Sequence, residues 1–311
     1  MFITFNVYAQ NQSDEKDLSY LSTVNEIRLP SKIGNIKIEE YFLYGKKSPE
    51  TNEDGIFVNE HYAAVIDGAT SKSNFSKDGK TSGRLAMELV IEAISKLPSS
   101  ATMEEAIEYI TANIYEFYKE NDMLDELKIH PNKRFTANGV IYSNSRQEVW
   151  QIGDCQCIIG DIYSSNEKAI DGIMANARAA FNEVAILKGE IKLENLGNYD
   201  PGREFIKPFL ERQAILQNNP NKEQPFSFPV FDGFPIHPEQ VNVFSVKNTK
   251  EIILSSDGYP YLFDTLKKSE EYLLDILKKD PNCFREYKST KGMKKGNHSF
   301  DDRAYLKISL E

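Results

Sequence analysis

The chain has 311 residues, 40% of them hydrophobic and 27% charged, with a formal net charge of −10 at pH 7. This composition excludes extensive disorder, and the acidic balance argues against nucleic acid or a membrane as a partner, because both attract basic surfaces. Three cysteines in a chain of this length do not make a disulfide scaffold, and they indicate a reducing, cytoplasmic location. No apolar segment is long enough to cross a membrane.

In the first half of the chain, strands are predicted at 33–44, 56–58 and 62–66. A helix is predicted from about Ser82, because Leu85, Leu89 and Ala93 recur every four residues, and Pro98 ends it. A second helix is predicted to follow directly, with Thr102 and Glu105 forming a capping box at its start.

In the second half, short strands are predicted at 136–142, 147–152 and 155–159. Residues 160–240 are predicted to be an insert, with helices at 169–187 and 202–216. Strands at 241–246 and 251–254, a helix at 262–277 and a strand at 304–310 complete the order. Hairpin-like strand pairs beside consecutive helices predict an α+β fold, with antiparallel sheets and the helices outside.

Two acidic motifs share one local design. An apolar strand runs into Asp67-Gly68, and another runs into Asp257-Gly258. Asp-Gly is common in hairpin turns, but neither motif is followed at once by a second strand. A sheet fixes the backbone of such a carboxylate, which therefore loses little freedom on binding a ligand. Asp67 and Asp257 are the first candidates for a catalytic site, and each glycine is expected to let the chain turn sharply after its aspartate.

Two further acidic segments stand just before strands, Asp301-Asp302 and Asn52-Glu53-Asp54. Taken singly, acids in this position are usually solvated or cap an element. If they converge with Asp67 and Asp257, their mutual repulsion calls for cations. Hard divalent ions with oxygen ligands would satisfy such a cluster, and two of them could activate a water for attack on phosphorus.

An ordered set of six short motifs extends this interpretation: Asn52-Glu53-Asp54, Val65-Ile66-Asp67-Gly68, Phe135-Thr136-Ala137, Ile152-Gly153-Asp154, Ser256-Asp257-Gly258 and Asp301-Asp302. In order and spacing the set resembles the type-2C (PPM) family of metal-dependent serine/threonine protein phosphatases. The resemblance implies one domain with a four-layer αββα sandwich of two mostly antiparallel sheets. Residues 1–32 would be an N-terminal extension, and 160–240 an enlarged helical flap.

The resemblance also implies a site with two Mn²⁺ or Mg²⁺ ions. Asp67 would bridge both ions, the Gly68 carbonyl would join one of them, and Asp257 and Asp301 would complete the other. Glu53 and Asp54 would act through bound waters. The implied reaction is hydrolysis of phosphoserine or phosphothreonine in a protein by a hydroxide between the ions.

The chain departs from the family pattern at two positions. Pro49 stands where many members have an arginine that binds the substrate phosphate, so Lys46 or Lys47 would have to take this role. Ala69 stands where many eukaryotic members have a histidine. Two alternatives follow: a binding module of the same fold without turnover, or a phosphatase for small molecules whose insert covers the substrate.

Other candidates are weaker. Asp67-Gly68-Ala69-Thr70 resembles a haloacid dehalogenase motif, but Val65 stands where that chemistry needs an aspartate nucleophile. Cys155 and Cys157 are interpreted as core residues. The four histidines are interpreted as surface or turn residues, with His298 a possible neighbour of Asp301. A loop with Lys291, Lys294 and Lys295 is interpreted as solvated, with a phosphosubstrate contact left open.

Overall fold

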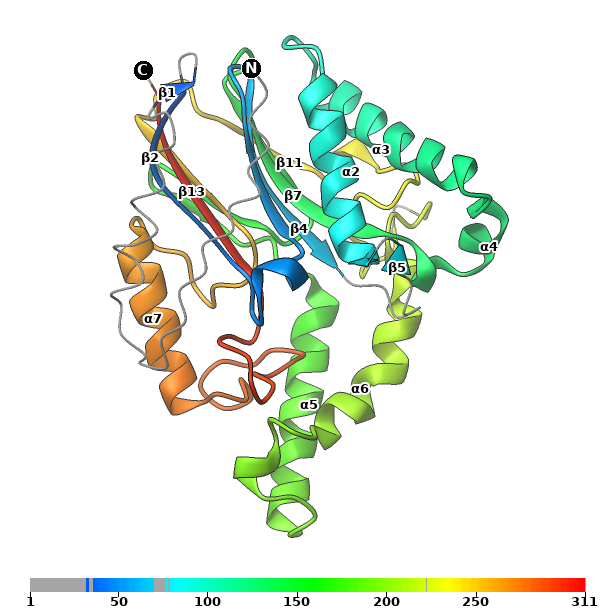
Figure 1. Cartoon of the computed structure of the whole chain (residues 1–311), viewed down its shortest axis with the longest axis vertical. Coiled ribbons are helices and arrows are strands. Elements are labelled where there is room, and N and C mark those ends of the chain that lie inside the picture. Colours follow the sequence, from blue (N-terminus) through cyan, green and yellow to red (C-terminus); the bar gives the residue numbers. More distant parts are fainter. Residues whose placement is uncertain (1–31, 34–35, 70–75, 78, 222, 311) are drawn as a thin grey trace.

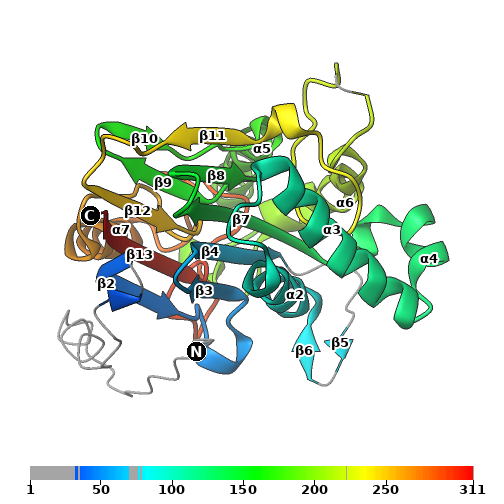
Figure 2. The same cartoon turned by 90° about the horizontal axis from the view of Figure 1, so that it is seen from above.

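The computed structural model describes residues 32–33, 36–69, 76–77, 79–221 and 223–310. Two antiparallel sheets lie face to face, as Figures 1 and 2 show. One sheet has six strands in the order β1 (Lys32–Ile33), β2 (Ile36–Tyr44), β13 (Arg303–Leu310), β12 (Glu251–Ser255), β9 (Gln156–Ile159) and β10 (Ile162–Ser164). The other has five, in the order β11 (Asn242–Ser245), β8 (Glu148–Ile152), β7 (Thr136–Ser143), β4 (Tyr62–Ala69) and β3 (Asp54–Val58).

Helices form the two outer layers (Figure 1). The helices α2 (Ser82–Lys96) and α3 (Met103–Glu120) pack against the five-stranded sheet, and α7 (Leu266–Lys279) packs against the six-stranded sheet. The short α4 (Leu124–Ile129) follows α3, and a small hairpin of β5 (Ser76–Lys77) and β6 (Lys80–Thr81) precedes α2. The predicted α+β sandwich with antiparallel sheets and outer helices is therefore confirmed.

The alternation of side chains along each strand explains this stacking. On β4, Ala63 and Val65 join the core between the sheets, whereas Ala64 and Ile66 join the core beneath α2 and α3. Both faces of the strand are buried, which is why its sequence is continuously apolar rather than alternating. Cys155 and Cys157 are buried free thiols in the core between the sheets, as predicted.

Most predicted elements lie where expected. Thr102 and Glu105 form the predicted capping box, and α2 ends two residues before Pro98. The last helix starts later than predicted, at Leu266, because Thr265 caps it and accepts a hydrogen bond from the Lys268 amide. Among the described residues no helix is both long and apolar enough to span a membrane.

The insert leaves the sandwich at one end. After β10, the helices α5 (Ala169–Leu187) and α6 (Pro201–Arg212) extend below the sheets in Figure 1 and pack against each other. The second helix ends at Arg212 rather than at Leu216, and residues Gln213–Leu216 form a 3-10 turn. Short 3-10 turns also occur at Pro49–Thr51, Pro131–Lys133, Leu193–Asn195 and Pro238–Gln240.

Candidate active site

Three neighbouring strands of the five-stranded sheet place oxygen-bearing side chains side by side. In the strand register, Asp67 on β4 lies opposite Asp54 on β3 and opposite Asn138 on β7. Asp67 follows Ala63 and Val65 at intervals of two residues, so it points into the space between the sheets, as they do. Directly opposite side chains on neighbouring strands have Cβ atoms about 5 Å apart. The three side chains thus form one row at the end of the sandwich.

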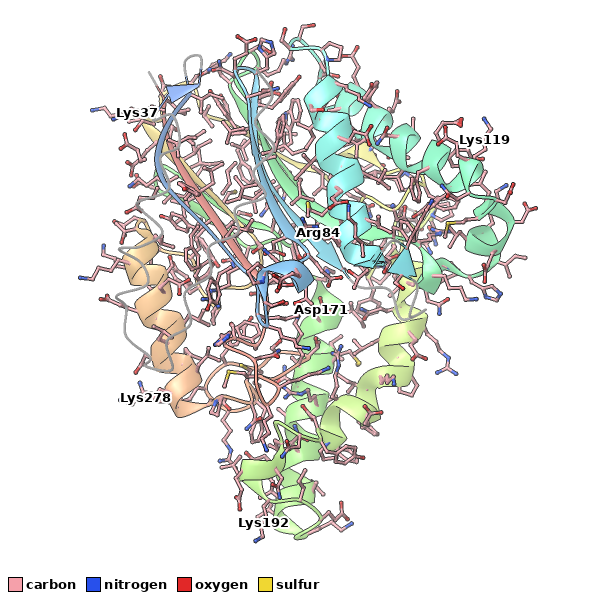
Figure 3. All side chains as sticks on the ribbon, in the orientation of Figure 1. Lys37, Arg84, Lys119, Asp171, Lys192 and Lys278 are labelled. Atoms are coloured by element: carbon pink, nitrogen blue, oxygen red, sulfur yellow. The ribbon has the colours of Figure 1, made fainter. Side chains whose placement is uncertain are left out.

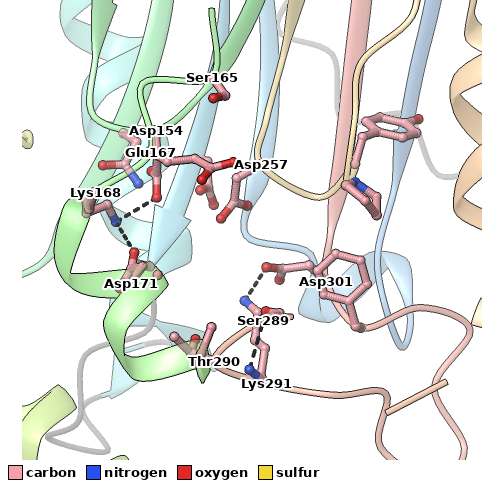
Figure 4. A pocket seen from close by; sticks show the side chains of 18 of the residues that line it. Asp154, Ser165, Glu167, Lys168, Asp171, Asp257, Ser289, Thr290, Lys291 and Asp301 are labelled. Carbon is pink, nitrogen blue, oxygen red and sulfur yellow. Dashed lines mark hydrogen bonds and ion pairs between the residues drawn. The ribbon is translucent and has the colours of Figure 1, made fainter. Parts of the chain in front are cut away.

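Two more aspartates from other segments complete the cluster. Asp257 follows the end of β12, and Asp154 lies in the turn between β8 and β9. One carboxylate oxygen from each of Asp67, Asp154 and Asp257 lies within 4.8 Å of the other two. Figure 4 shows Asp154 and Asp257 near each other on the same side of the pocket. The two aspartates singled out first in the sequence therefore meet in space.

Asp154 is a member of this cluster that the sequence analysis did not propose as a ligand. In the sequence, Ile152-Gly153-Asp154 is one motif of the ordered set, and the pair Gly153-Asp154 also suits a turn. The turn is real, since Gly153 has a φ of +77°. The signal that could have identified Asp154 is the one used for Asp67 and Asp257, an apolar strand that runs into an aspartate next to a glycine.

Without a cation, the ionised forms of the carboxylates in this cluster are electrostatically unfavourable. Burial, followed by the charges of Asp301 and Asp154, raises the pKa of Asp67 from its ordinary value of 3.8 to about 6. Burial and the neighbouring Asp67 also raise the pKa of Asp54 and of Asp257. A group of acids that resists ionisation in this way is stabilised by a bound cation.

The donor atoms fit a hard divalent cation. Asp54 Oδ2, Asn138 Oδ1 and Asp154 Oδ1 are buried and have no hydrogen-bond partner among the residues described here. Buried polar atoms are rarely left without a partner, and such atoms are often explained by an ion or a water. All the donors are carboxylate or amide oxygens, the ligands that Mg²⁺ and Mn²⁺ take.

Asp301 lines the same pocket but is engaged differently. Its Oδ1 lies 3.2 Å from the Nζ of Lys46, and its Oδ2 forms an ion pair with Lys291. Burial alone would raise the pKa of Asp301, but Lys291 and Lys46 outweigh it and hold this pKa at about 2. Asp301 is therefore ionised and paired, and it is not one of the three aspartates that share the common 4.8 Å cluster.

The neighbouring Asp302 fixes the segment that carries Lys46. Asp302 accepts hydrogen bonds from the backbone N of Lys46 at 2.7 Å, from Lys46 Nζ at 2.9 Å and from the backbone N of Glu53 at 3.3 Å. Asp302 is 3% exposed, so these bonds serve a carboxylate with almost no access to water. They tie the loop after β2 to the beginning of β13.

Glu53 and Gly68 lie on a tightly packed wall of the pocket. Glu53 accepts a hydrogen bond from the hydroxyl of Thr81, and the Gly68 amide donates to the Glu53 carbonyl at 3.2 Å. A Cβ on Gly68 would lie 2.1 Å from the carbonyl oxygen of Gly83, so only glycine fits there. The expected sharp turn after Asp67 is wrong, because β4 continues through Gly68 to Ala69. Close packing explains this glycine.

The remaining candidates divide clearly. Lys46 lines the pocket, whereas Lys47 is exposed and is not part of the described lining. His298 is exposed and its ring packs edge-on against Tyr44, with centroids 6.1 Å apart. Lys294 and Lys295 are exposed, as the solvated interpretation predicted, but Lys291 reaches into the pocket and pairs with Asp301.

The opposite wall of the pocket belongs to the insert and to the loop before β13. The pocket has a volume of about 370 Å³. Lys168 pairs with Asp154 at 2.8 Å and with Asp171 at 3.5 Å, as Figure 4 shows. In Figure 3, Asp171 lies where the insert meets the sandwich. Other lining residues from this wall are Gly172, Ala175, Arg203, Leu210, Gln213, Lys288, Ser289, Thr290 and Lys291.

A buried arginine joins the insert to this loop. Arg178 on α5 has no exposed surface. Its guanidinium binds Asp200, at the start of α6, at 2.6 and 2.8 Å, and it donates to the carbonyl oxygens of Asn282, Cys283 and Ser289 at 2.7 to 2.8 Å. One side chain thus fixes two helices and the loop that carries Lys291, although nothing in the local sequence marks Arg178 as special.

Comparison with known proteins identifies the family to which the chain belongs. The family model for protein phosphatase 2C matches residues 50–295. The chain is therefore a member of the protein phosphatase 2C family, which confirms the resemblance inferred from the ordered motifs. A comparison with curated proteins gives no match.

Solved structures of bacterial phosphatases are similar to this chain at low sequence identity. The serine/threonine phosphatase Stp1 from Staphylococcus aureus is 14% identical, with a TM-score of 0.45 over 92% of this chain and 100% of the other. The phosphatase PstP/Ppp from Mycobacterium tuberculosis is 14% identical, with a TM-score of 0.43 over 88% of this chain and 98% of the other. The PstP catalytic domain in complex with 2 manganese ions is 12% identical, with a TM-score of 0.44 over 87% and 97%.

Proposed function

We propose that this protein is a metal-dependent phosphomonoester hydrolase that acts on phosphoserine or phosphothreonine in proteins. The observation that carries this proposal is the meeting of Asp67, Asp154 and Asp257 within 4.8 Å, in a pocket that is also lined by lysine and arginine side chains. Membership of the protein phosphatase 2C family supports the reaction class and a phosphoprotein substrate. The cytoplasmic location expected from the cysteine content belongs to the same proposal.

The described geometry supports one choice of metal ligands. Asp67, Asp154 and Asp257 would hold Mn²⁺ or Mg²⁺ directly, with the Asn138 amide oxygen and the Gly68 carbonyl as further donors. Glu53, Asp54 and Asp301 would act from the next layer, through waters or through their own partners. When bound, two such ions would supply an activated water and offset the charge of the phosphate. The chain itself fixes the carboxylates on sheet ends, so little ordering is required on binding.

Lys46 is the better of the two lysine candidates for the substrate phosphate. It lines the pocket, and the Coulombic attraction of Asp301 and Asp302 outweighs the effect of its burial and raises its pKa, so it stays charged. Its ammonium group is already shared between these two aspartates. It therefore offers a phosphate a positive point charge rather than a free pair of donors.

The test is the hydrolysis of p-nitrophenyl phosphate by the purified chain. Turnover should require Mn²⁺ or Mg²⁺, stop on addition of EDTA and fall by more than about 100-fold in Asp257→Asn, the upper end of the loss seen for residues that only support a ligand. Metal binding should be measured in parallel by calorimetry. Activity that persists both in EDTA and in the variant would contradict the metal-dependent reaction.

A second substrate class has specific support from the insert. Its residues Lys168, Arg203 and Gln213 form part of the pocket wall, so a substrate in the pocket contacts the insert as well as the sandwich. A small phosphomonoester would fit such a site. Comparing kcat/KM for phosphopeptides and for free phosphorylated metabolites decides between the two, since a protein phosphatase should favour the peptides.

A further inference from the structure

We propose that Arg203, on the insert helix α6, binds the phosphoryl group of the substrate. This inference rests on the proposed phosphomonoester hydrolase function and adds the residue that recognises the anion. Arg203 lies in the first turn of α6, three residues after the N-cap residue Asp200. It lines the pocket that contains the aspartate cluster. No interaction with substrate is assigned to it by the family motifs.

The partners of the cations around the pocket distinguish Arg203 from the others. Lys46 and Lys291 pair with Asp301, and Lys168 pairs with Asp154 and Asp171. Lys288 donates to the neutral side chain of Asn176 and is exposed. Among the described residues that line the pocket, Arg203 is the one partly buried cation that forms no ion pair with a carboxylate. It is available to an incoming anion.

The guanidinium of Arg203 keeps donors free. Its Nη1 donates to the Thr290 carbonyl oxygen at 2.6 Å, and no acceptor among the described residues is bound to its Nη2 or Nε. Nε and Nη2 form the planar edge that binds two oxygens of a phosphate at once. Burial and the neighbouring Arg178 lower the pKa of Arg203, and an anion beside it would relieve this unfavourable environment.

The position of Arg203 relative to the aspartates is fixed by a short chain of contacts. Thr290, which accepts its hydrogen bond, directly precedes Lys291, and the Lys291 ammonium group pairs with Asp301. The charge of Asp301 itself acts on Arg203. Figure 4 shows Thr290 and Lys291 on the side of the pocket opposite Asp154 and Asp257. A phosphate between these walls faces the aspartate cluster on one side and Arg203 on the other.

The insert also holds Arg203 in place before any ligand arrives. Its backbone N donates to Asp200 Oδ1 at 2.8 Å, and the other oxygen of Asp200 is bound by the buried Arg178. A site whose donors are already ordered loses less conformational entropy on binding. Pro49, at the position where family members often carry a phosphate-binding arginine, leaves this role open for a guanidinium from another segment.

Binding of inorganic phosphate in the presence of Mg²⁺, measured by calorimetry, tests the proposal without requiring turnover. Arg203→Met should weaken binding about tenfold or more, as expected for the loss of a charge-assisted pair of hydrogen bonds. Arg203→Lys keeps the charge but loses the planar pair of donors. Its phosphate affinity should lie between that of Arg203→Met and that of the native protein. Arg212→Met is the matched control, because Arg212 is exposed on the same helix and outside the described lining; it should bind as the native chain does.

The outcomes separate this inference from the proposed function. If phosphate binding depends on Arg203 but the protein hydrolyses no phosphomonoester, the anion site is supported and the proposed hydrolase function is contradicted. If Arg203→Met hydrolyses p-nitrophenyl phosphate with an unchanged KM and binds phosphate with unchanged affinity, the anion site is contradicted and the hydrolase function is retained. Absence of phosphate binding in the native protein would also overturn the site. Thermal unfolding of each variant checks that the fold is retained.

Discussion

The two walls of the pocket differ in architecture and in charge. The sandwich wall carries Asp67, Asp154 and Asp257 on strand ends and tight turns of two rigid sheets. The opposite wall carries Lys168, Arg203 and Lys291 on the insert helices and a loop. The sandwich thus supplies acids that suit cations, and the insert supplies cations that suit an anionic substrate. In the proposed function, metal binding and substrate recognition would be divided between these two parts of the chain.

The two walls also differ in how their charges are stabilised. On the sandwich side, burial raises the pKa of Asp67 and Asp257, so these acids are held in an unfavourable environment. On the other side, Lys168 and Lys291 are partly buried and paired. The attraction of Asp154 raises the pKa of Lys168, and that of Asp301 raises the pKa of Lys291, because each exceeds the effect of burial. The comparison predicts that changes on the sandwich wall affect activity most, whereas changes on the insert wall affect binding and local stability.

The largest effect is expected for Asp154→Asn. If Asp154 is a direct ligand, this variant should lose activity as completely as Asp257→Asn, by more than about 100-fold. Metal affinity measured by calorimetry should fall with it. The matched control is Asp161→Asn, an exposed aspartate in the turn that follows β9, which should leave both quantities unchanged. Full activity in Asp154→Asn would remove Asp154 from the site and restore the role predicted for Asp301.

A large loss of stability is expected for Arg178→Met. The change leaves Asp200 without its arginine and three carbonyl oxygens without a donor, in a buried place. Removing one partner of a buried pair costs about 3–5 kcal/mol. Urea unfolding should show this loss. The control Arg285→Met removes an exposed pair with Glu183, which should cost about 0–1 kcal/mol. Equal effects of the two variants would contradict the role of Arg178 as the link between insert and loop.

The metal-free protein should become more stable as the pH falls from 7 to 5. Asp67 has a pKa of about 6 in the fold and 3.8 as its ordinary value, so folding is favoured when it is protonated. Its contribution is complete below pH 3.8 and is lost as the pH rises through 6. Asp301 acts in the opposite direction. Its pKa is lowered from 3.8 to about 2, so its contribution to stability is present above pH 3.8 and is lost as the pH falls through about 2. Thermal unfolding in EDTA measures this slope.

Two additions sharpen the pH experiment. Added Mg²⁺ should raise the unfolding temperature more at pH 7 than at pH 5, because protons and metal compete for the same carboxylates. Asp67→Asn should flatten the slope, since the amide does not titrate. A slope in EDTA that runs in the opposite direction would show that the acids of the sandwich wall are not held in an unfavourable state.

The smallest effect is expected from the two neighbouring lysines. Lys46→Met should raise KM about tenfold, the scale of one charged hydrogen bond, because Lys46 lines the pocket. Lys47→Met should change KM by less than about twofold, as is usual for an exposed charge outside a site. Because Lys46 also binds Asp302, the stability of both variants should be compared. A larger effect for Lys47 would show that the substrate approaches from the solvent side of this loop.

Much of the architecture could be predicted from local sequence. The capping box at Thr102 and the helix 169–187 lie where the pattern placed them, because periodicity and capping act over a few residues. The acidic cluster could be predicted in part. Asp67 and Asp257 stood out as acids after apolar strands, whereas Asp154 had the same context but also suited a turn. Local context does not distinguish these two uses of an aspartate.

By itself, the sequence determined the family, the order of the elements and two members of the acidic cluster, because these depend on short motifs and on their spacing. The tertiary structure decided which side chains share the pocket. Lys46 and Lys47 are adjacent in sequence and equal in chemistry, yet only Lys46 points to Asp301 and Asp302, which lie some 255 residues away along the chain. Arg203 lines the pocket, and Arg178 holds the insert against the loop, for the same reason. Their partners come from segments that meet only when the insert packs against the loop before β13.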